Sequence, residues 1–256
     1  MSIRYAWLAL LFVLLQPAMV EAEADVSTGE VMPRALAEFE AVYKVRASIA
    51  SGEMSMSFKA MDGGGFLFRT LTSPRGLVRM FARGEIDESS EVVIAGDSIV
   101  PLNYTVRDTI SKNHDANIRF DWDSGTVAGV ERGEDVSGDL RPGMLNRAAL
   151  YVAIMRDLKL NRLPEQYVLF DRGQIKAYQL ENLGKEYVEV PYGRFEAVKL
   201  VRDSDNSRRS MYLWCAPELD YLPIRIELYK DDKRVSRADL RAVTGLPASG
   251  QVQGPR

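Results

Sequence analysis

The chain has 256 residues and a formal net charge of −3, with 46% of the residues hydrophobic and 27% charged. This composition is typical of globular proteins and supplies enough apolar residues for one sizeable core. The near-neutral charge argues against nucleic acid or an anionic membrane surface as the main partner, because both reward a basic patch. A single cysteine, Cys215, excludes an internal disulfide, and we expect it to be a buried thiol.

The first residues have the pattern of a secretory signal. Arg4 precedes an apolar run over 5–15, which Pro17 interrupts, and residues 22–24 offer a small-x-small cleavage pattern. A membrane span needs about 20 apolar residues, so the run is too short for an anchor. We therefore predict a signal peptide over 1–24, a flexible leader over 25–36 and no transmembrane span after cleavage.

Short stretches of alternating apolar and polar residues follow, as expected for strands with one wet face. A turn is predicted at Gly52. The run at 62–65 reads as a hairpin turn rather than a phosphate loop, because a strand and no helix follows it. Pro101 predicts an edge or a bend in its strand. The predicted strands cover residues 39–47, 54–58, 66–70, 78–82, 99–106, 118–122 and 127–130.

The pattern changes once, between 143 and 159, where a helix is predicted. Met144, Ala148, Tyr151, Met155 and Leu158 recur at steps of three and four residues. The apolar stripe is wide, so we expect the helix to pack in the concavity of the sheet rather than on its outside.

Strands resume after the helix. They are predicted over 167–170, 175–180, 187–190, 195–201 and 235–243, with a hairpin over 208–230 whose connection is bracketed by Pro217 and Pro223. No linker composition interrupts the chain, which predicts one domain over 37–245 and a disordered tail over 246–256. The fold class expected is mainly β: a curved antiparallel sheet or open β-barrel with one inserted α-helix packed on it.

Catalytic patterns are weak. The sole histidine, His114, lies in a polar stretch without a nucleophile elbow, and one histidine does not make a typical zinc or facial-triad site. Asp121 and Asp123 share one strand face at a spacing suited to glycoside hydrolysis, but aspartates at a turn commonly cap their own backbone. We expect no enzyme, no metal and no cofactor.

Aromatic and apolar residues exceed what one sheet face needs. They indicate either a two-sided core, with the helix covering one side, or an apolar cavity able to hold a lipid chain. If a cavity exists, Arg209 or Arg225 at its rim would face an anionic head group. The residues expected in its wall are Phe120, Trp122, Tyr151, Met155, Tyr212 and Trp214.

Three phrases of the sequence, taken together and in order, resemble a known family. They are 99–104, 190–200 and the hairpin segments 213–217 and 222–225. The chain resembles the domain of unknown function 3108 family, periplasmic proteins of Gram-negative bacteria, over about residues 37–243. The resemblance implies a periplasmic location and a β architecture with one helix. In outline this is similar to the periplasmic lipoprotein carriers, which is an analogy at the level of fold.

We therefore expect a periplasmic protein that binds a lipid or other amphiphile without catalysis, in the maintenance of the cell envelope. The alternative is an envelope protein-interaction module that adds a partner's strand to an exposed sheet edge. A third possibility is a glycan-acting enzyme that uses Asp121 and Asp123.

Overall fold

The structure is a computed structural model that describes residues 36–47, 50–76, 84–111, 114–203 and 208–246. All of these residues lie in one compact unit. The predicted signal peptide over 1–24, the strand expected over 78–82 and nearly all of the predicted leader and tail lie outside the described residues.

Within the described residues, fourteen strands form one antiparallel sheet in the order β8-β7-β6-β5-β4-β3-β2-β1-β14-β13-β12-β11-β10-β9. A short 3₁₀ turn, η2 (Pro217–Leu219), joins β12 to β13. The strands are β1 (Phe39–Ala47), β2 (Ala50–Ala60), β3 (Phe66–Pro74), β4 (Ile86–Ala95), β5 (Ser98–Asp108), β6 (Ala116–Asp121), β7 (Thr126–Glu131), β8 (Glu134–Asp139), β9 (Gln166–Asp171), β10 (Gln174–Val190), β11 (Gly193–Asp203), β12 (Arg209–Ala216), β13 (Leu222–Lys230) and β14 (Lys233–Thr244).

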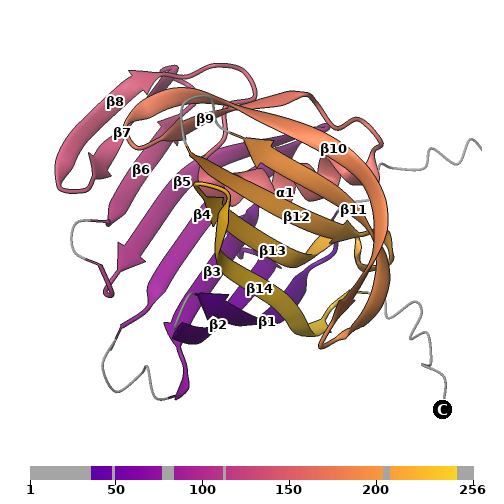
Figure 1. Cartoon of the computed structure of the whole chain (residues 1–256). Coiled ribbons are helices and arrows are strands. Elements are labelled where there is room, and N and C mark those ends of the chain that lie inside the picture. Colours follow the sequence, from indigo (N-terminus) through magenta and orange to yellow (C-terminus); the bar gives the residue numbers. More distant parts are fainter. Residues whose placement is uncertain (1–35, 48–49, 77–83, 112–113, 204–207, 247–256) are drawn as a thin grey trace, which may run out of the picture. The chain divides into compact units, whose positions relative to one another are not determined.

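The order shows two meanders joined through their first and last strands. β1 to β8 run outward to one edge, β9 to β14 return from the other edge, and β1 pairs with β14 in the middle. The sheet curls around α1 (Arg147–Lys159), the α-helix of the described residues, which links the two edges in sequence (Figure 1). The predicted fold class is confirmed, and the sheet is not closed into a barrel.

The helix α1 starts at a polar cap and is buried on every side. The side chain of Asn146 accepts a hydrogen bond from the backbone N–H of Ala149 at 2.8 Å, which satisfies one of the free donors of the first turn. Nine of its thirteen residues are buried, because sheet surrounds the helix instead of covering a single stripe. No described helix is long and apolar enough to span a membrane.

The two edges of the sheet meet through side chains instead of ladder hydrogen bonds. A side chain at Gly173, between β9 and β10, would lie 2.7 Å from Val136 of β8, so only glycine fits there. The carboxylate of Glu131 accepts a hydrogen bond from the Gly173 N–H at 2.9 Å. Leu145, just before α1, forms a parallel bridge to Leu169 of β9 and so covers part of that edge.

Four features differ from the sequence predictions. β4 was not predicted, because Asp87, Glu88 and Glu91 interrupt the alternation in its sequence. β8 was not predicted, because its sequence holds a single large apolar residue, Val136, and so shows no alternation. β10 is one strand where two were predicted, and the interval between them is a bulge in which Gly184 has φ +90°. Gly52 does not turn the chain. It lies inside β2, where an added Cβ would be 2.9 Å from the carbonyl oxygen of Ser73.

Candidate functional site

The inner face of the sheet, defined as the face that packs against α1, changes from apolar to basic along the C-terminal strands. Met211 of β12 identifies this face, because its sulfur accepts a hydrogen bond from the Tyr151 hydroxyl of α1 at 3.6 Å. Met211 pairs with Arg202 of β11. Residues two apart on a strand share a face, so Arg209 also lies on the inner face, directly opposite Lys230 of β13.

Arg202, Arg209 and Lys230 line a pocket of about 810 Å³, here called the basic pocket. Leu228 and Val235 give it an apolar wall and are 39% and 36% exposed. Among the described residues that line it, six are basic and only one, Asp171, is acidic. The basic residues are Arg147, Arg172, Lys176, Arg202, Arg209 and Lys230.

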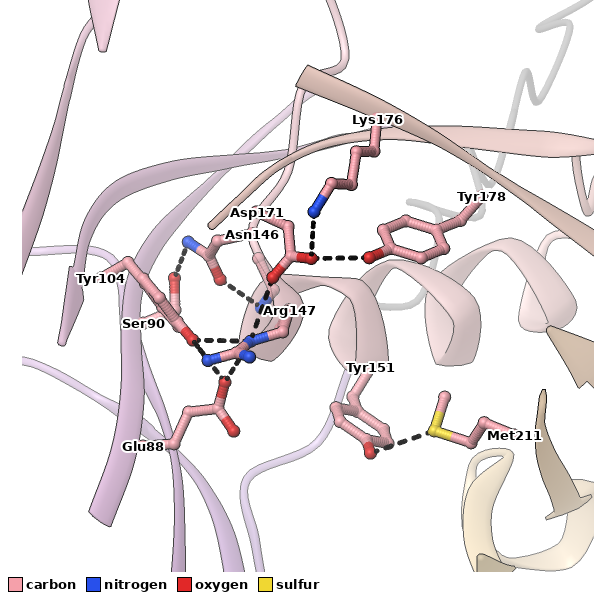
Figure 2. A network of polar contacts seen from close by, with 11 residues as sticks. Glu88, Ser90, Tyr104, Asn146, Arg147, Tyr151, Asp171, Lys176, Tyr178 and Met211 are labelled. Carbon is pink, nitrogen blue, oxygen red and sulfur yellow. Dashed lines mark hydrogen bonds and ion pairs between the residues drawn. The ribbon is translucent and has the colours of Figure 1, made fainter. Parts of the chain in front are cut away.

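Arg147, in the first turn of α1, joins the pocket to the N-terminal meander (Figure 2). Its Nε and Nη2 donate to the Tyr104 hydroxyl of β5 at 2.9 and 2.6 Å, and its Nε lies 3.4 Å from Glu88 of β4. Tyr104 in turn donates to Glu88 at 2.6 Å. Burial opposes the charge on Arg147, but the phenol and two carboxylates outweigh it and raise the pKa of the guanidinium.

Asp171, at the end of β9, holds the same arginine from the C-terminal side. Its Oδ1 lies 3.6 Å from Arg147 Nε, and its Oδ2 accepts hydrogen bonds from the Tyr178 hydroxyl at 2.7 Å and from Lys176 at 3.2 Å. Burial alone would raise the pKa of Asp171. Arg147, Tyr178 and Lys176 together outweigh burial and hold the pKa below its usual value. Asp171 is thus an ionised carboxylate that connects Arg147, Lys176 and Tyr178, and these residues are here called the pocket floor.

Arg202 is placed differently from Arg147. Its guanidinium lies over the ring of Tyr178, 4.6 Å from the ring centroid, which fixes the plane of the group. Its Nε is buried and has no hydrogen-bond partner among the described residues. A buried donor without an acceptor is costly and marks a place where a ligand oxygen would be stabilised.

A second pocket of about 470 Å³ adjoins the first, since Arg147, Arg172 and Arg209 line both. Its charge is mixed rather than basic. Glu88, Asp108 and Glu131 contribute carboxylates, and His114 and Arg132 contribute further nitrogen groups. The excess of positive charge therefore belongs to the basic pocket and not to the whole inner surface.

Of the eight residues expected to bind a ligand, Arg209 lines the basic pocket. Met155 and Phe120 are buried in the core. Tyr151 stacks on Phe68 at 5.8 Å between ring centroids and reaches Met211 beneath the pocket. The indole N–H of Trp122 donates to the backbone carbonyl of Pro101 at 2.7 Å, and the ring packs against the core.

Tyr212, Trp214 and Arg225 lie on the opposite, outer face of the sheet. Tyr212 alternates with Met211, and Trp214 pairs directly with Arg225. The Trp214 indole donates to Glu186 at 2.5 Å, and Arg225 Nε donates to Asp239 at 2.8 Å. The structure therefore divides the eight residues between the two faces and does not gather them around one cavity.

Sequence reasoning missed most of the basic pocket. Arg202 lies on the same face of β11 as Val198 and Leu200, both of which are buried. A charged residue in this otherwise apolar series could have indicated a site from the sequence. Lys230 similarly continues the row of Leu228. Arg147 and Lys176 carried no such signal, because only the fold brings their parent elements to Asp171.

The catalytic alternatives gain no geometric support from the described residues. His114 is exposed and lies 3.2 Å from Asp108, as expected for a loop residue. Asp121 accepts a hydrogen bond from the Ser124 backbone N–H at 3.0 Å, which holds the pKa of its carboxyl below the usual value. Thus Asp121, rather than Asp123, caps this turn. Cys215 is a buried thiol, as predicted, and burial raises its pKa.

Comparison with known proteins gives a family and a fold. A family model described as "Protein of unknown function (DUF3108)" matches residues 38–233. A crystal structure of a beta-barrel-like protein of domain of unknown function DUF1849 from Brucella abortus is similar, with a TM-score of 0.57 and 11% identity. That similarity covers 83% of this chain and 99% of the other, and at this identity it concerns the fold alone.

The MucA/MucB complex of Pseudomonas aeruginosa is also similar, with a TM-score of 0.35 and 14% identity over 88% of this chain and 57% of that one. No curated protein is significantly similar to the chain in sequence.

Proposed function

The chain belongs to the DUF3108 family of proteins of unknown function, and we propose that it binds an anionic amphiphile in the cell envelope without converting it. The observation that carries this proposal is the composition of the basic pocket. In the part of the chain that the structure describes, six basic side chains share its lining with one carboxylate.

The charge pattern supports an anionic ligand. Asp171 Oδ2 accepts hydrogen bonds from Lys176 and the Tyr178 hydroxyl, and its buried Oδ1, which has no hydrogen bond among the described residues, faces Arg147 at 3.6 Å, so the carboxylate of the described lining is held by cations of the protein. Arg209 and Lys230 lie directly opposite each other on β12 and β13, so the lining places two cationic side chains at neighbouring positions.

The walls support an amphiphile rather than a bare ion. A volume of about 810 Å³ lies within the range of pockets that hold small organic molecules. Leu228 and Val235 expose apolar surface inside it, and Met211 and Tyr151 lie below. A ligand with a charged head and an apolar chain would satisfy both parts of the lining.

The absence of catalysis is part of the proposal. A general base acts best with a pKa near the working pH. The pKa of Asp171 is shifted the other way, below its usual value, by Arg147, Tyr178 and Lys176. The carboxylate is therefore suited to holding the pocket open and in shape. The envelope location rests on the signal pattern at 1–24.

Strand addition at a sheet edge is the less favoured alternative. β8 is six residues long and carries Glu134, Asp135 and Asp139, and short, charged edge strands resist pairing with other chains. At the other edge, Leu145 already pairs with part of β9.

Native mass spectrometry of the full chain purified from the periplasm, followed by organic extraction, tests the proposal. We expect a co-purified anionic amphiphile that is lost from Lys230→Glu and kept by Lys233→Glu. The two lysines pair across the β13–β14 hairpin, and only Lys230 lines the pocket. Equal loss from both variants, or no binding of added decyl phosphate or laurate, would contradict the proposal.

A further inference from the structure

The lining of the basic pocket holds one buried acceptor and one buried donor that lack hydrogen bonds among the described residues. The acceptor is Oδ1 of Asp171, and the donor is Nε of Arg202. We propose, on the basis of the function proposed above, that the ligand carries a hydroxyl group beside its acid group. The acid accepts a hydrogen bond from Arg202, and the hydroxyl donates one to Asp171. The ligand class is thus a hydroxylated anionic amphiphile rather than a plain fatty acid.

The two oxygens of Asp171 are used unequally (Figure 2). Its Oδ2 accepts hydrogen bonds from the Tyr178 hydroxyl at 2.7 Å and from Lys176 at 3.2 Å. Its Oδ1 lies 3.6 Å from Arg147 Nε, which is close enough for an ion pair but too long for a hydrogen bond. That nitrogen donates to the Tyr104 hydroxyl at 2.9 Å instead. Because Oδ1 is closed to bulk water, it is a costly acceptor until a donor enters the lining.

The charge around Oδ1 selects the kind of donor. Arg147 faces Oδ1, and Lys176 bonds the other oxygen of the same carboxylate. An ammonium group brought to this place would be repelled by both cations. A hydroxyl is neutral, and besides donating to Oδ1 it has lone pairs that accept from a neighbouring cation. The side chains of Arg147 and Lys176 are 31% and 30% exposed, so they can move outward to admit it.

Tyr178 brings the acceptor and the donor to the same part of the pocket. Its hydroxyl bonds Asp171 at 2.7 Å, and the guanidinium of Arg202 lies 4.6 Å from the centroid of its ring. Asp171 and Arg202 therefore contact two parts of one side chain. A ligand that reaches both must carry its hydroxyl within a few bonds of its acid group, and a hydroxyl at the far end of the chain does not meet this requirement.

The experiment compares laurate with 2-hydroxylaurate, 3-hydroxylaurate and 12-hydroxylaurate. Affinities are measured at pH 7.5 by calorimetry on the full chain, after co-purified ligand has been exchanged over a hydrophobic resin. A hydroxyl makes the ligand less apolar, so a pocket that only buries apolar surface would bind all three hydroxy acids less tightly than laurate. We expect the tighter of the 2- and 3-hydroxy acids to bind about tenfold more tightly than laurate. The 12-hydroxy acid should bind no more tightly than laurate.

Asp171→Asn tests which group receives the hydroxyl. The amide keeps the size of the side chain but loses the charge and half of the acceptors, so the preference over laurate should fall to about twofold or less. The control is Glu134→Gln, which changes an exposed carboxylate of β8 outside the described lining of the pocket and should keep the preference. A preference that survives in Asp171→Asn overturns the role of Asp171.

The wild-type chain alone separates the failure of this inference from that of the proposed function. If laurate binds and neither the 2- nor the 3-hydroxy acid binds more tightly, the hydroxyl inference fails and the proposed function stands. An equal gain for 12-hydroxylaurate overturns the placement of the hydroxyl beside the acid. If none of the four ligands binds, both the inference and the proposed function fail.

Discussion

The two faces of the C-terminal strands organise their charged groups differently. On the outer face, Arg225 and Arg237 bond the two oxygens of Asp239 at 2.8 and 2.7 Å, and Arg234 bonds Glu227 at 3.0 Å. Both carboxylates are nearly fully buried. On the inner face, the described lining of the basic pocket holds six basic residues and one carboxylate, Asp171, which contacts Arg147 and Lys176.

The comparison separates charges that hold the fold from charges that are available to a ligand. A buried carboxylate with two arginines is satisfied within the protein, and its loss leaves cations without a partner. An excess of one sign in a pocket costs stability in the free protein and is relieved by a counter-charge from outside. The outer face is therefore structural, and the basic pocket is the place to look for binding.

The largest expected effect is on the outer face. Asp239→Ala removes the carboxylate shared by Arg225 and Arg237, and we expect the free energy of unfolding in urea to fall by about 3 kcal/mol. The control is Arg208→Ala, which breaks the same kind of pair at an exposed position, with Asp231, and should cost about 0.5 kcal/mol or less. Similar losses in both variants would remove the distinction between the faces.

The next effect concerns the pocket floor. Asp171→Asn weakens the bonds to Lys176 and Tyr178 and should lower the free energy of unfolding by about 2 kcal/mol at pH 7. Because its pKa is lowered on folding, the ionised Asp171 stabilises the protein above the unfolded value of about 3.9. This stability is lost as the pH falls through the folded pKa.

Urea unfolding of wild type and Asp171→Asn between pH 7 and pH 3 measures this difference. The gap between the two proteins should close toward pH 3. A gap that stays constant would show that the charge of Asp171 is not what stabilises the floor.

A smaller effect in free energy distinguishes ligand binding from stability. Arg202→Met keeps an apolar side chain over Tyr178 but removes the guanidinium group with its buried Nε. We expect the affinity for decyl phosphate to fall about tenfold, with the free energy of unfolding changed by less than about 1 kcal/mol. Calorimetry and urea unfolding measure the two quantities. A large loss of stability with unchanged affinity would show that Arg202 stabilises the fold, as the outer-face arginines do, and does not bind the ligand.

The smallest effect is a gain. Lys230→Gln removes a charge that faces Arg209 on one side and Lys233 on the other, so the free energy of unfolding should rise by about 0.5 kcal/mol at low salt. Salt of about 0.5 M should erase the gain by screening. A loss of stability at low salt would mean that Lys230 is compensated within the protein.

The sequence predicted the strands and the helix well because their signals are local. Alternation located β1, β5, β11, β12 and β14, and steps of three and four residues located α1. It missed β8, whose residues include only one large apolar side chain, and it divided β10 at the bulge around Gly184. Both β8 and the continuous β10 form because they pair with neighbouring strands, and a local sequence pattern does not show such pairing.

The site was harder to predict because β12 is apolar on both parities. Met211 and Leu213 face α1, and Tyr212 and Trp214 face outward, where Lys199 lies 5.1 Å from the ring of Trp214. The sequence of β12 alone does not show which of these two sets of alternating residues packs against α1. Arg209 was selected as a rim residue and does line the pocket, whereas Arg225 pairs with Asp239 on the other face.

The pairing of the first strand with the last has a consequence for the order of folding. Glu40 of β1 lies opposite Thr244 of β14, so β1 has a partner on only one side until the chain has been made as far as β14. Contacts so distant in sequence slow folding, and an unpaired strand invites pairing with other chains. The N-terminal meander must wait, with one edge open, for β14. Closing the centre of the sheet therefore joins residues about 200 positions apart in sequence, and it cannot take place before β14 has been made.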